Sequence, residues 1–473
     1  MRKVLGAILL AILGLGLAGK AIAAEASALE INSSAGAEHL SRAIQFKTVS
    51  YQDPAKFDPA PFLSLQAYLE KTYPLLHKNL KKELVANYTL LYQWEGTDPS
   101  LKPILLMGHQ DVVPAGPENE WTQPPFSGKI ADGFIWGRGT LDDKVSLMGI
   151  LEAVEYLLDK GFQPKRTIYI CSSHDEEVGG SGTVAVAALL KSRGVSLEYV
   201  LDEGGAVTTG VIPGVKKPVA LVATAEKGYM SVELSVETKG GHASAPSMDN
   251  SIGILATAIH NLERRQFPAA LKGVTEQTFE ALLPYLEPRM QFIFKNRRLF
   301  GPAIIKELEK SQTGNATLRT TIAPTIIGAG EKENILPRKA TAVVNLRLMQ
   351  GDTIGYVLNH INRAINDPRV KVSILGRANE ASKVSDPNSD WYQMLSNSIQ
   401  EIYPDAVVAP LLEIGATDSR HFQELSDNIF RFTPAFLNAE DLERAHNINE
   451  RIGADNYGQV IKFYALFIQN SEQ

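Results

Sequence analysis

The chain alternates short, continuous apolar stretches with segments whose apolar residues recur at helical spacing. Between residues 141 and 158, apolar side chains return every three or four positions, which predicts a helix with one buried face. Strands that alternate with helices in this way favour an α/β fold built on a mostly parallel sheet. The stretches that predict buried strands are residues 103–107, 167–172, 199–201 and 428–432.

A different pattern begins near residue 226. Residues 229–237 and 340–348 alternate apolar and polar side chains, as strands with one wet face do. Helical patterns follow at about 252–262 and 353–365. We therefore predict a small α+β domain inserted into a discontinuous catalytic domain. The predicted divisions are 1–24, 25–225 (first catalytic part), 226–378 (inserted domain) and 379–473 (second catalytic part).

The first 24 residues have the features of an export signal. Arg2 and Lys3 precede an apolar run over residues 4–18, and Ala21 and Ala23 provide a small-x-small cleavage site. The run is shorter than the ~20 residues that span a bilayer. We expect an exported protein, periplasmic or secreted, and the alternative is an uncleaved N-terminal membrane anchor.

The composition of the chain limits the partners and the kinds of metal site that it can have. The 473 residues include 47 Lys or Arg against 53 Asp or Glu, a formal charge of −6, which argues against a nucleic-acid partner. Cys171 is the single cysteine, so an internal disulfide and a cysteine-based zinc cluster are both excluded. Any bound metal would need His, Asp and Glu ligands.

Acidic residues and histidines follow the predicted strands or stand at helix boundaries. Ligands bind at the carboxyl edge of open α/β sheets, where these side chains would gather. Three consecutive acids at 175–177 would repel one another unless a cation neutralised them. Adjacent glutamates also have a chemical use, because one can bind a metal while the other takes a proton from metal-bound water. Nitrogen and oxygen ligands of this kind suit zinc, cobalt or manganese.

Seven short segments carry these residues: M-G-H-Q-D-V-V-P, G-R-G-T-L-D-D-K, D-E-E-V-G-G, L-D-E-G-G, G-G-H-A-S, G-A-T-D-S-R-H and R-A-H-N-I-N-E. Together they resemble the M20 family of dinuclear zinc metallopeptidases. The similarity covers essentially the whole chain after the N-terminal segment, and it is strongest to the branch of carboxypeptidase S and the N-fatty-acyl-amino-acid synthase/hydrolase; aminoacylase-1 is more distant. That family has an α/β catalytic domain interrupted by a lid domain.

The resemblance implies a pair of zinc ions, with cobalt or manganese as substitutes. His109 would bind the first ion and Asp142 would bridge both. Asp202 would complete the first site, with Glu203 as an alternative because the alignment can slip by one residue. The second ion would be held by Glu177 and His446. The peptide bond after Asp142 is cis in relatives.

The resemblance also implies roles in catalysis and substrate binding. Asp111 would orient His109, Glu176 would be the general base, and His242 would polarise the scissile carbonyl from the same chain or from a neighbouring subunit. We expect homodimers to form through the lid domain, and the N-terminal segment to hold the protein on a membrane only if it is uncleaved. Candidates for binding the substrate carboxylate are Arg347, Asn334, Thr417, Asp418 and Arg420.

We therefore expect a metal-dependent hydrolase that cleaves short peptides in the manner of a carboxypeptidase, or N-acyl amino acids. The alternative is a non-catalytic metal- or peptide-binding protein that keeps the fold. Retention of Glu176 beside the full candidate ligand set disfavours that alternative. A serine hydrolase is excluded because the sequence around Ser181 lacks the final glycine of G-x-S-x-G.

Overall fold

A computed structural model describes residues 29–472, which form two compact units. The first unit comprises the described residues up to Ala223, Ser385–Ala409 and the chain from Thr417 onward. The second unit comprises Thr224–Val384 and Pro410–Ala416. The insert predicted over 226–378 falls inside this second unit.

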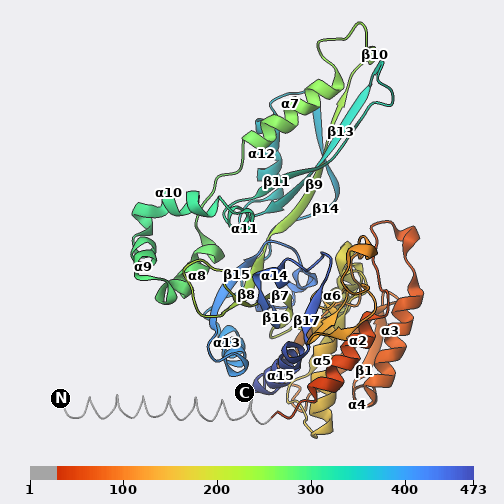
Figure 1. Cartoon of the computed structure of the whole chain (residues 1–473), viewed down its shortest axis with the longest axis vertical. Coiled ribbons are helices and arrows are strands. Elements are labelled where there is room, and N and C mark those ends of the chain that lie inside the picture. Colours follow the sequence, from red (N-terminus) through yellow and green to blue (C-terminus); the bar gives the residue numbers. More distant parts are fainter. Residues whose placement is uncertain (1–28, 473) are drawn as a thin grey trace, which may run out of the picture. The chain divides into compact units, whose positions relative to one another are not determined.

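The first unit is built on a mixed sheet of eight strands in the order β1-β2-β6-β3-β7-β16-β8-β15 (Figure 1). The central neighbours β6, β3, β7 and β16 run parallel, whereas β1, β2 and β8 pair antiparallel with their neighbours. The predicted α/β class is thus confirmed. The strands are β1 (Lys81–Val85), β2 (Thr89–Trp94), β3 (Ile104–Met107), β6 (Ile168–Ser172), β7 (Val200–Thr209), β8 (Val219–Glu226), β15 (Val407–Glu413) and β16 (Ile429–Asn438).

Helices cover both faces of this sheet because its central strands are apolar on both sides. In β3, Ile104 and Leu106 belong to one core cluster, while Leu105 and Met107 belong to the other, as the two-residue period of a strand requires. The larger cluster includes α2, α5, α13 and α15, and the smaller one includes α6. The helices are α2 (Ser33–Ile44), α3 (Pro59–Thr72), α4 (Pro74–Asn79), α5 (Lys144–Asp159), α6 (Ser181–Ser192), α13 (Asp390–Ile402), α14 (Ala439–Leu442) and α15 (Ala454–Asn470).

A smaller three-stranded sheet in the first unit joins distant parts of the chain. Its order is β17-β5-β4, so the strand near the C-terminus pairs with the segment that precedes α5. This pairing brings the His446 loop to the loop that carries Asp142. The strands are β4 (Ile130–Ala131), β5 (Phe134–Trp136) and β17 (Arg451–Gly453).

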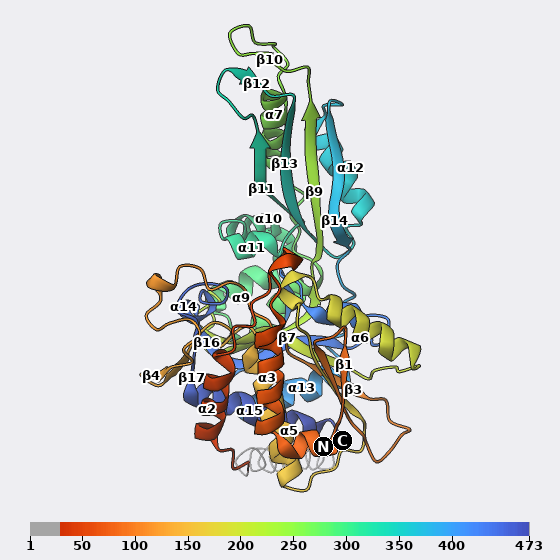
Figure 2. The same ribbon diagram turned by 90° about the vertical axis from the view of Figure 1, so that its right-hand side faces the viewer.

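The second unit contains an antiparallel sheet in the order β11-β13-β9-β14, with helices against one face (Figure 2). Along β13, alternate residues such as Ala342, Val344 and Leu346 are buried against α7 and α12. Strands β10 and β12 form a two-residue ribbon. The elements are β9 (Gly228–Glu237), β10 (Gly241–His242), β11 (Thr321–Ala329), β12 (Ile335–Leu336), β13 (Lys339–Leu348), β14 (Val370–Asn379), α7 (Ser251–Arg264), α8 (Gly273–Leu282), α9 (Pro288–Lys295), α10 (Arg297–Leu308), α11 (Gln312–Ala316) and α12 (Ile354–Ile365).

The predicted export signal or anchor over residues 1–24 lies outside the described residues. Among residues 29–472, none of the helices combines the length and the apolar character needed to cross a membrane.

Candidate metal centre

The predicted ligands come from five separate segments that meet at one edge of the large sheet. His109 follows β3 by two residues, Glu177 lies in a 3-10 helix (Glu176–Val178) after β6, and Glu203 lies in β7. Asp142 stands just before α5, and His446 occupies the loop between α14 and β17. The carboxyl ends of parallel strands therefore bring together residues that lie more than 300 positions apart in the sequence.

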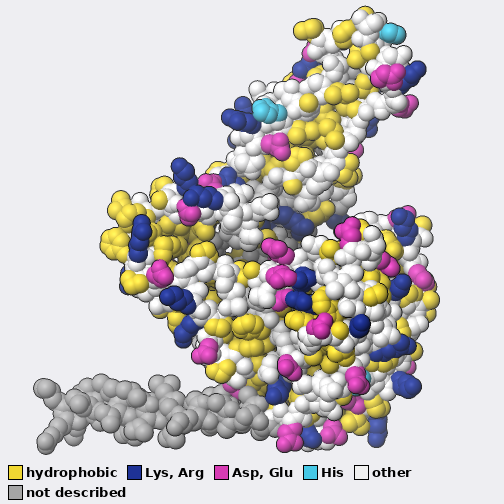
Figure 3. Space-filling model, in the orientation of Figure 1, with side chains coloured by type: hydrophobic (Ala, Val, Ile, Leu, Met, Phe, Trp, Pro, Cys, Tyr) yellow, Lys and Arg dark blue, Asp and Glu magenta, His cyan; other side chains and the backbone are white. Residues whose placement is uncertain are grey.

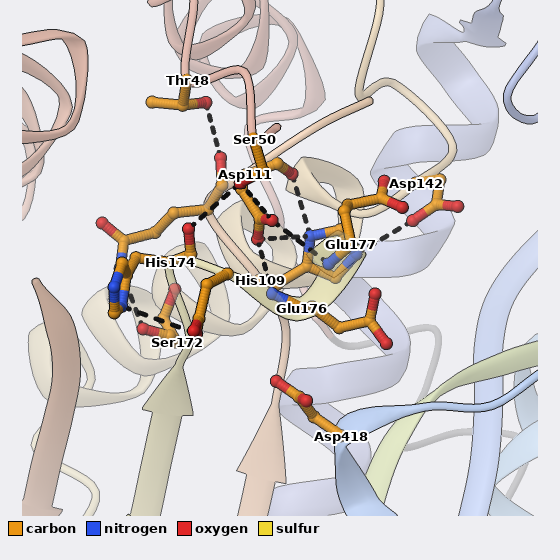
Figure 4. Close-up of polar contacts among 12 residues, drawn as sticks. Thr48, Ser50, His109, Asp111, Asp142, Ser172, His174, Glu176, Glu177 and Asp418 are labelled. Atoms are coloured by element: carbon orange, nitrogen blue, oxygen red, sulfur yellow. Dashed lines mark hydrogen bonds and ion pairs between the residues drawn. The ribbon is translucent and has the colours of Figure 1, made fainter. Parts of the chain in front are cut away.

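The first group of donors consists of His109, Asp142 and Glu203. The His109 Nε2 atom lies 2.9 Å from Asp142 Oδ1 and 3.3 Å from Glu203 Oε1. The His109 imidazole is almost fully buried, and carboxylates lie around it (Figure 4). One nitrogen and two carboxylate oxygens thus converge on a single point.

The second group consists of Asp142, Glu177 and His446. The His446 Nε2 atom lies 2.9 Å from Asp142 Oδ2 and 3.2 Å from Glu177 Oε2. Asp142 belongs to both groups and presents a different carboxylate oxygen to each histidine. The Asp142–Asp143 peptide bond is cis, as the resemblance implies.

Charge and hydrogen bonding both show that these donors fit divalent cations. Burial, and then the charge of Asp142, raises the pKa of Glu203 well above its ordinary value. Burial also raises the pKa of Glu177, whose buried Oε1 atom has no hydrogen-bond partner in the described part of the chain. In each group the donor atoms lie within 4.8 Å of one another, with no thiolate among them. Carboxylate oxygens and imidazole nitrogens are ligands that zinc, cobalt and manganese accept.

The structure places Glu203 in the first group in place of Asp202. Asp202 Oδ2 instead accepts a hydrogen bond of 2.8 Å from the Ser419 backbone N–H. Successive residues of a strand point to opposite faces, so only one of these two carboxylates can face His109. A bulge lies at this point of the strand, where β16 pairs with Asp202 and then with Gly205 and leaves Glu203 and Gly204 without partners in β16. The geometry therefore replaces Asp202 with Glu203 as the candidate ligand.

Asp111 connects His109 to the loop that carries the two glutamates. The His109 Nδ1 atom lies 2.9 Å from the Asp111 backbone oxygen and 3.4 Å from its carboxylate. That carboxylate accepts hydrogen bonds from the backbone N–H groups of Glu176 and Glu177, at 3.1 and 3.2 Å. Ser50 donates a further bond of 2.7 Å to Asp111 (Figure 4). Asp111 thus fixes both the imidazole and the glutamate backbone.

The three consecutive acids have different surroundings. Asp175 accepts hydrogen bonds from the first residues of α6, including one of 2.8 Å from the Ser181 backbone N–H, and so has a structural role. Glu177 faces His446, whereas Glu176 belongs to neither donor group. Burial, and then the nearby Asp418 carboxylate, raises the pKa of Glu176 well above its ordinary value.

Glu450, which the sequence did not single out, joins the His446 loop to the Asp142 loop. Its Oε1 atom accepts hydrogen bonds from the backbone N–H groups of Gly139, Leu141 and Asp142, at 3.0, 2.7 and 3.2 Å. Its Oε2 atom lies 2.5 Å from Arg138 Nη1, and both side chains are buried. The signal was present in the sequence, because Glu450 ends the R-A-H-N-I-N-E motif that supplies His446.

Two candidates for substrate binding, Thr417 and Arg420, belong to the first unit. The Thr417 hydroxyl lies 2.7 Å from Ser419 Oγ and accepts a bond of 3.2 Å from Arg431 Nε. Arg420 donates a bond of 2.5 Å to the Thr417 backbone oxygen. The neighbouring Asp418 is buried and accepts a bond of 2.6 Å from Thr183. These contacts stabilise the loop itself.

The remaining candidates belong to the second unit. His242 is exposed, and its Nδ1 atom accepts a hydrogen bond of 3.1 Å from the Ser244 backbone N–H. The Asn334 backbone oxygen accepts a bond of 3.0 Å from Ala243 N–H, so His242 and Asn334 lie side by side on the β10–β12 ribbon. The Arg347 guanidinium lies 5.1 Å from the centre of the Tyr229 ring on the neighbouring strand.

The fold and the donor set define a metal-dependent hydrolase of the α/β type with an inserted α+β unit. A family model described as "Peptidase family M20/M25/M40" matches residues 105–470, and the chain belongs to this family. "Probable carboxypeptidase S-like 2" of Dictyostelium discoideum is 43% identical over 447 residues, covering 92% of this chain and 85% of that protein. The human "N-fatty-acyl-amino acid synthase/hydrolase PM20D1" is 40% identical over 440 residues, covering 92% of this chain and 87% of that protein.

A solved structure supports the same fold. The M20 family metallo-carboxypeptidase Sso-CP2 from Sulfolobus solfataricus aligns with a TM-score of 0.70 at 21% identity, covering 92% of this chain and 98% of that one. The predicted family, its carboxypeptidase S-like branch and the enzyme class, an M20 metallopeptidase or amidohydrolase, are confirmed by these comparisons.

Proposed function

We propose that this enzyme binds two zinc ions and hydrolyses the amide bond on the amino side of an amino acid with a free carboxylate. The substrates would be short peptides, as for a carboxypeptidase, or N-acyl amino acids. The observation that carries this proposal is the position of Asp142, which offers one carboxylate oxygen to each of two donor groups. One relative is named as a carboxypeptidase and the other as an N-fatty-acyl-amino acid synthase/hydrolase, so their names support each of the two substrate classes once.

Divalent metals, when bound by His109, Asp142, Glu203, Glu177 and His446, supply Lewis acidity at this edge of the sheet. Glu176 is the proposed general base, because it stands beside Glu177 and outside both donor groups. A carboxylate at this position would accept a proton from the attacking water and return it to the leaving amine. Asp111 would position Glu176 through the backbone bond described above.

His242 is the proposed donor to the carbonyl oxygen as negative charge develops on it. A backbone N–H donates to its Nδ1 atom, so the neutral imidazole carries its proton on Nε2. The exposed Nε2–H is thus free to donate. Arg347, Asn334, Thr417 and Arg420 remain proposed contacts of the substrate carboxylate, and their guanidinium, amide and hydroxyl groups are donors that suit it.

The proposal is tested with Glu176→Gln, assayed on a panel of dipeptides and N-acyl amino acids. We expect bound zinc to be retained and turnover to fall by about 10²- to 10⁴-fold, because only the proton transfer is removed. Asp159→Asn, at the exposed end of α5, is the matched control and should retain full turnover. Unchanged turnover in the Glu176 variant would contradict its assignment as the base.

We also propose that two copies associate through the second unit. Strand β11 is an edge strand, and its Ile326 and Ile327 side chains are 64% and 66% exposed. An apolar edge strand favours pairing with another strand. Sedimentation of the wild type and of Ile326→Lys tests this, since only the wild type should be dimeric; two identical monomeric profiles would contradict it.

Export is proposed from the N-terminal sequence alone. Arg2, Lys3 and the apolar run would direct the chain to the periplasm or the exterior, with removal after Ala23. Determination of the N-terminal residue of the protein made in its own cells tests this. A chain that begins at Met1 in the membrane fraction would favour the anchor.

A further inference from the structure

Helices α9 and α10 carry large apolar side chains on their outer face. Phe292 is 61% exposed and Leu299 is 75% exposed, although both lie within well-formed helices. The Phe292 ring centre is 6.0 Å from that of Phe300, so the two helices share one apolar surface. Figure 3 shows hydrophobic and basic side chains together over these helices.

The same two helices are rich in basic residues, and their one acidic residue, Glu307, is paired with Lys310. Residues 288–306 contain five Lys or Arg and no Asp or Glu, in a chain whose formal charge is −6. Arg297 is paired with Glu276 and Glu280, at 2.7 and 2.6 Å. The four other basic residues are exposed and have no ion-pair partner within residues 29–472; they are Arg289, Lys295, Arg298 and Lys306.

The exposed apolar residues belong to a packed structure. The Phe294 ring on the inner face of α9 stacks on Phe279 of α8, with centres 4.6 Å apart. The two ion pairs of Arg297 attach the start of α10 to the same helix. Phe292 and Leu299 are therefore held outward by a fixed inner face. We call Arg289, Phe292, Lys295, Arg298, Leu299 and Lys306 the basic apolar surface.

We propose that the basic apolar surface docks on the headgroup region of an anionic phospholipid bilayer. Helices at such an interface bury an apolar face at the acyl boundary while Lys and Arg contact anionic headgroups. Charge complementarity selects this occupant, because four cations without an ion-pair partner within residues 29–472 surround protruding apolar side chains, and the one acid on these helices, Glu307, is paired with Lys310. The contact would be peripheral and independent of the N-terminal segment, and it does not rest on the proposed hydrolytic reaction.

A local fluorescent probe tests this docking in the full chain. Cys171 is buried, at 1% exposure, so Leu299→Cys introduces the one accessible thiol among residues 29–472 for a polarity-sensitive dye. Glu263→Cys, on an exposed position of α7 in the same unit, is the matched control. Vesicles of phosphatidylglycerol and phosphatidylcholine are compared with vesicles of phosphatidylcholine alone.

We expect a blue shift at position 299, and none at position 263, with the anionic vesicles. The apparent partition coefficient should be at least about tenfold higher than on neutral vesicles, and should fall with added salt. In the Leu299→Cys background, replacing Arg289, Lys295, Arg298 and Lys306 with Glu should abolish the shift. Circular dichroism and the unfolding temperature, which should stay unchanged, monitor the fold.

Four outcomes would overturn the proposal. They are an absent shift on anionic vesicles, an equal shift on neutral vesicles, an equal shift with polyglutamate, and a shift that depends on protein concentration alone. An equal shift with polyglutamate would indicate an acidic protein partner. A shift that depends only on protein concentration would indicate a second copy of this chain. Retention of the full shift after the four charge reversals would also contradict the role assigned to the basic residues.

Discussion

At the scale of single residues, the identity of one carboxylate decides how the first metal is held. Asp202 and Glu203 are adjacent, and motif similarity alone could not separate them. The folded β7 separates them, because Glu203 lies beside His109 whereas Asp202 accepts a hydrogen bond from Ser419 N–H. Tertiary pairing of this kind has no signal in a single sequence.

Variants of Glu203 and Asp202 give a matched comparison of metal affinity. We expect Glu203→Ala to lower zinc affinity by at least about tenfold, because it removes a ligand of the first ion. Loss of a residue that only hydrogen-bonds to a ligand already costs about that much, and loss of the ligand itself should cost no less. Asp202→Asn keeps a side-chain oxygen that can accept from Ser419 N–H, so it should retain most of the affinity. Calorimetric titration of the metal-free protein measures both. A larger loss in the Asp202 variant would contradict the assignment.

The roles of the three acids at 175–177 also separate at this scale. The sequence predicted different roles for Glu176, as base, and Glu177, as a metal ligand that here faces His446. It assigned no separate role to Asp175, which bonds to the start of α6. The repulsion argument correctly directed attention to the segment. The role of Asp175 depends on where α6 begins, which is a property of the folded chain.

At the scale of elements, the strand-and-helix pattern was predictable because it follows from local periodicity. The residues predicted as strands at 103–107 and 167–172 overlap β3 and β6, and the helix predicted over 141–158 overlaps α5. The contacts by which Glu450 joins the His446 loop to the Asp142 loop, which we call the Glu450 clamp, were not predictable. They depend on the pairing of β17 with β5, which joins segments about 300 residues apart.

This clamp should be important for stability as well as for the position of Asp142. Glu450→Ala leaves Arg138 buried without its partner and three backbone N–H groups without an acceptor. We expect a loss of about 3–5 kcal/mol in the free energy of unfolding. Glu443→Ala, at an exposed position of the same loop, should change it by less than about 0.5 kcal/mol.

Denaturant unfolding of the two variants checks this prediction, and zinc titration shows whether the Asp142 loop also moves. Equal stabilities of the Glu450 and Glu443 variants would show that the buried Glu450–Arg138 pair contributes nothing to the free energy of unfolding.

At the scale of the whole molecule, the second unit contains a buried lysine that should make its stability depend on pH. Lys227 donates hydrogen bonds to the backbone oxygens of Ala316 and Arg319, at 2.9 and 2.8 Å. Burial, and then the charge of Arg347, lowers the pKa of Lys227 from 10.5 to about 7. Between these two values the unfolded chain binds more protons than the folded one, so stability rises with pH across this window.

Lys227→Met removes this contribution. The wild type should therefore gain stability relative to the variant by about 1 kcal/mol per pH unit between pH 7 and 9. The hydrogen bonds lost to Ala316 and Arg319 add an offset that is independent of pH. Denaturant unfolding of both proteins at three pH values measures the difference. Parallel stability curves would show that Lys227 stays charged in the folded state.

The two-part architecture was partly readable in the sequence. A change from apolar strands to alternating strands near residue 226 predicts an inserted domain from that point, and the second compact unit of the structure begins at Thr224. The sequence did not indicate that Pro410–Ala416 also belongs to that unit. This segment includes the end of β15, and its membership depends on contacts across the chain, which no local pattern records.

The central claim is that Asp142 joins two metal sites that act in amide hydrolysis. The most direct measurement is a zinc titration of chelator-treated protein, with calorimetry and hydrolysis of N-acyl amino acids and dipeptides followed together. We predict that chelation abolishes hydrolysis, that two equivalents bind per chain, and that activity returns as they bind. Saturation at one equivalent, or hydrolysis that persists in the metal-free protein, would contradict the account.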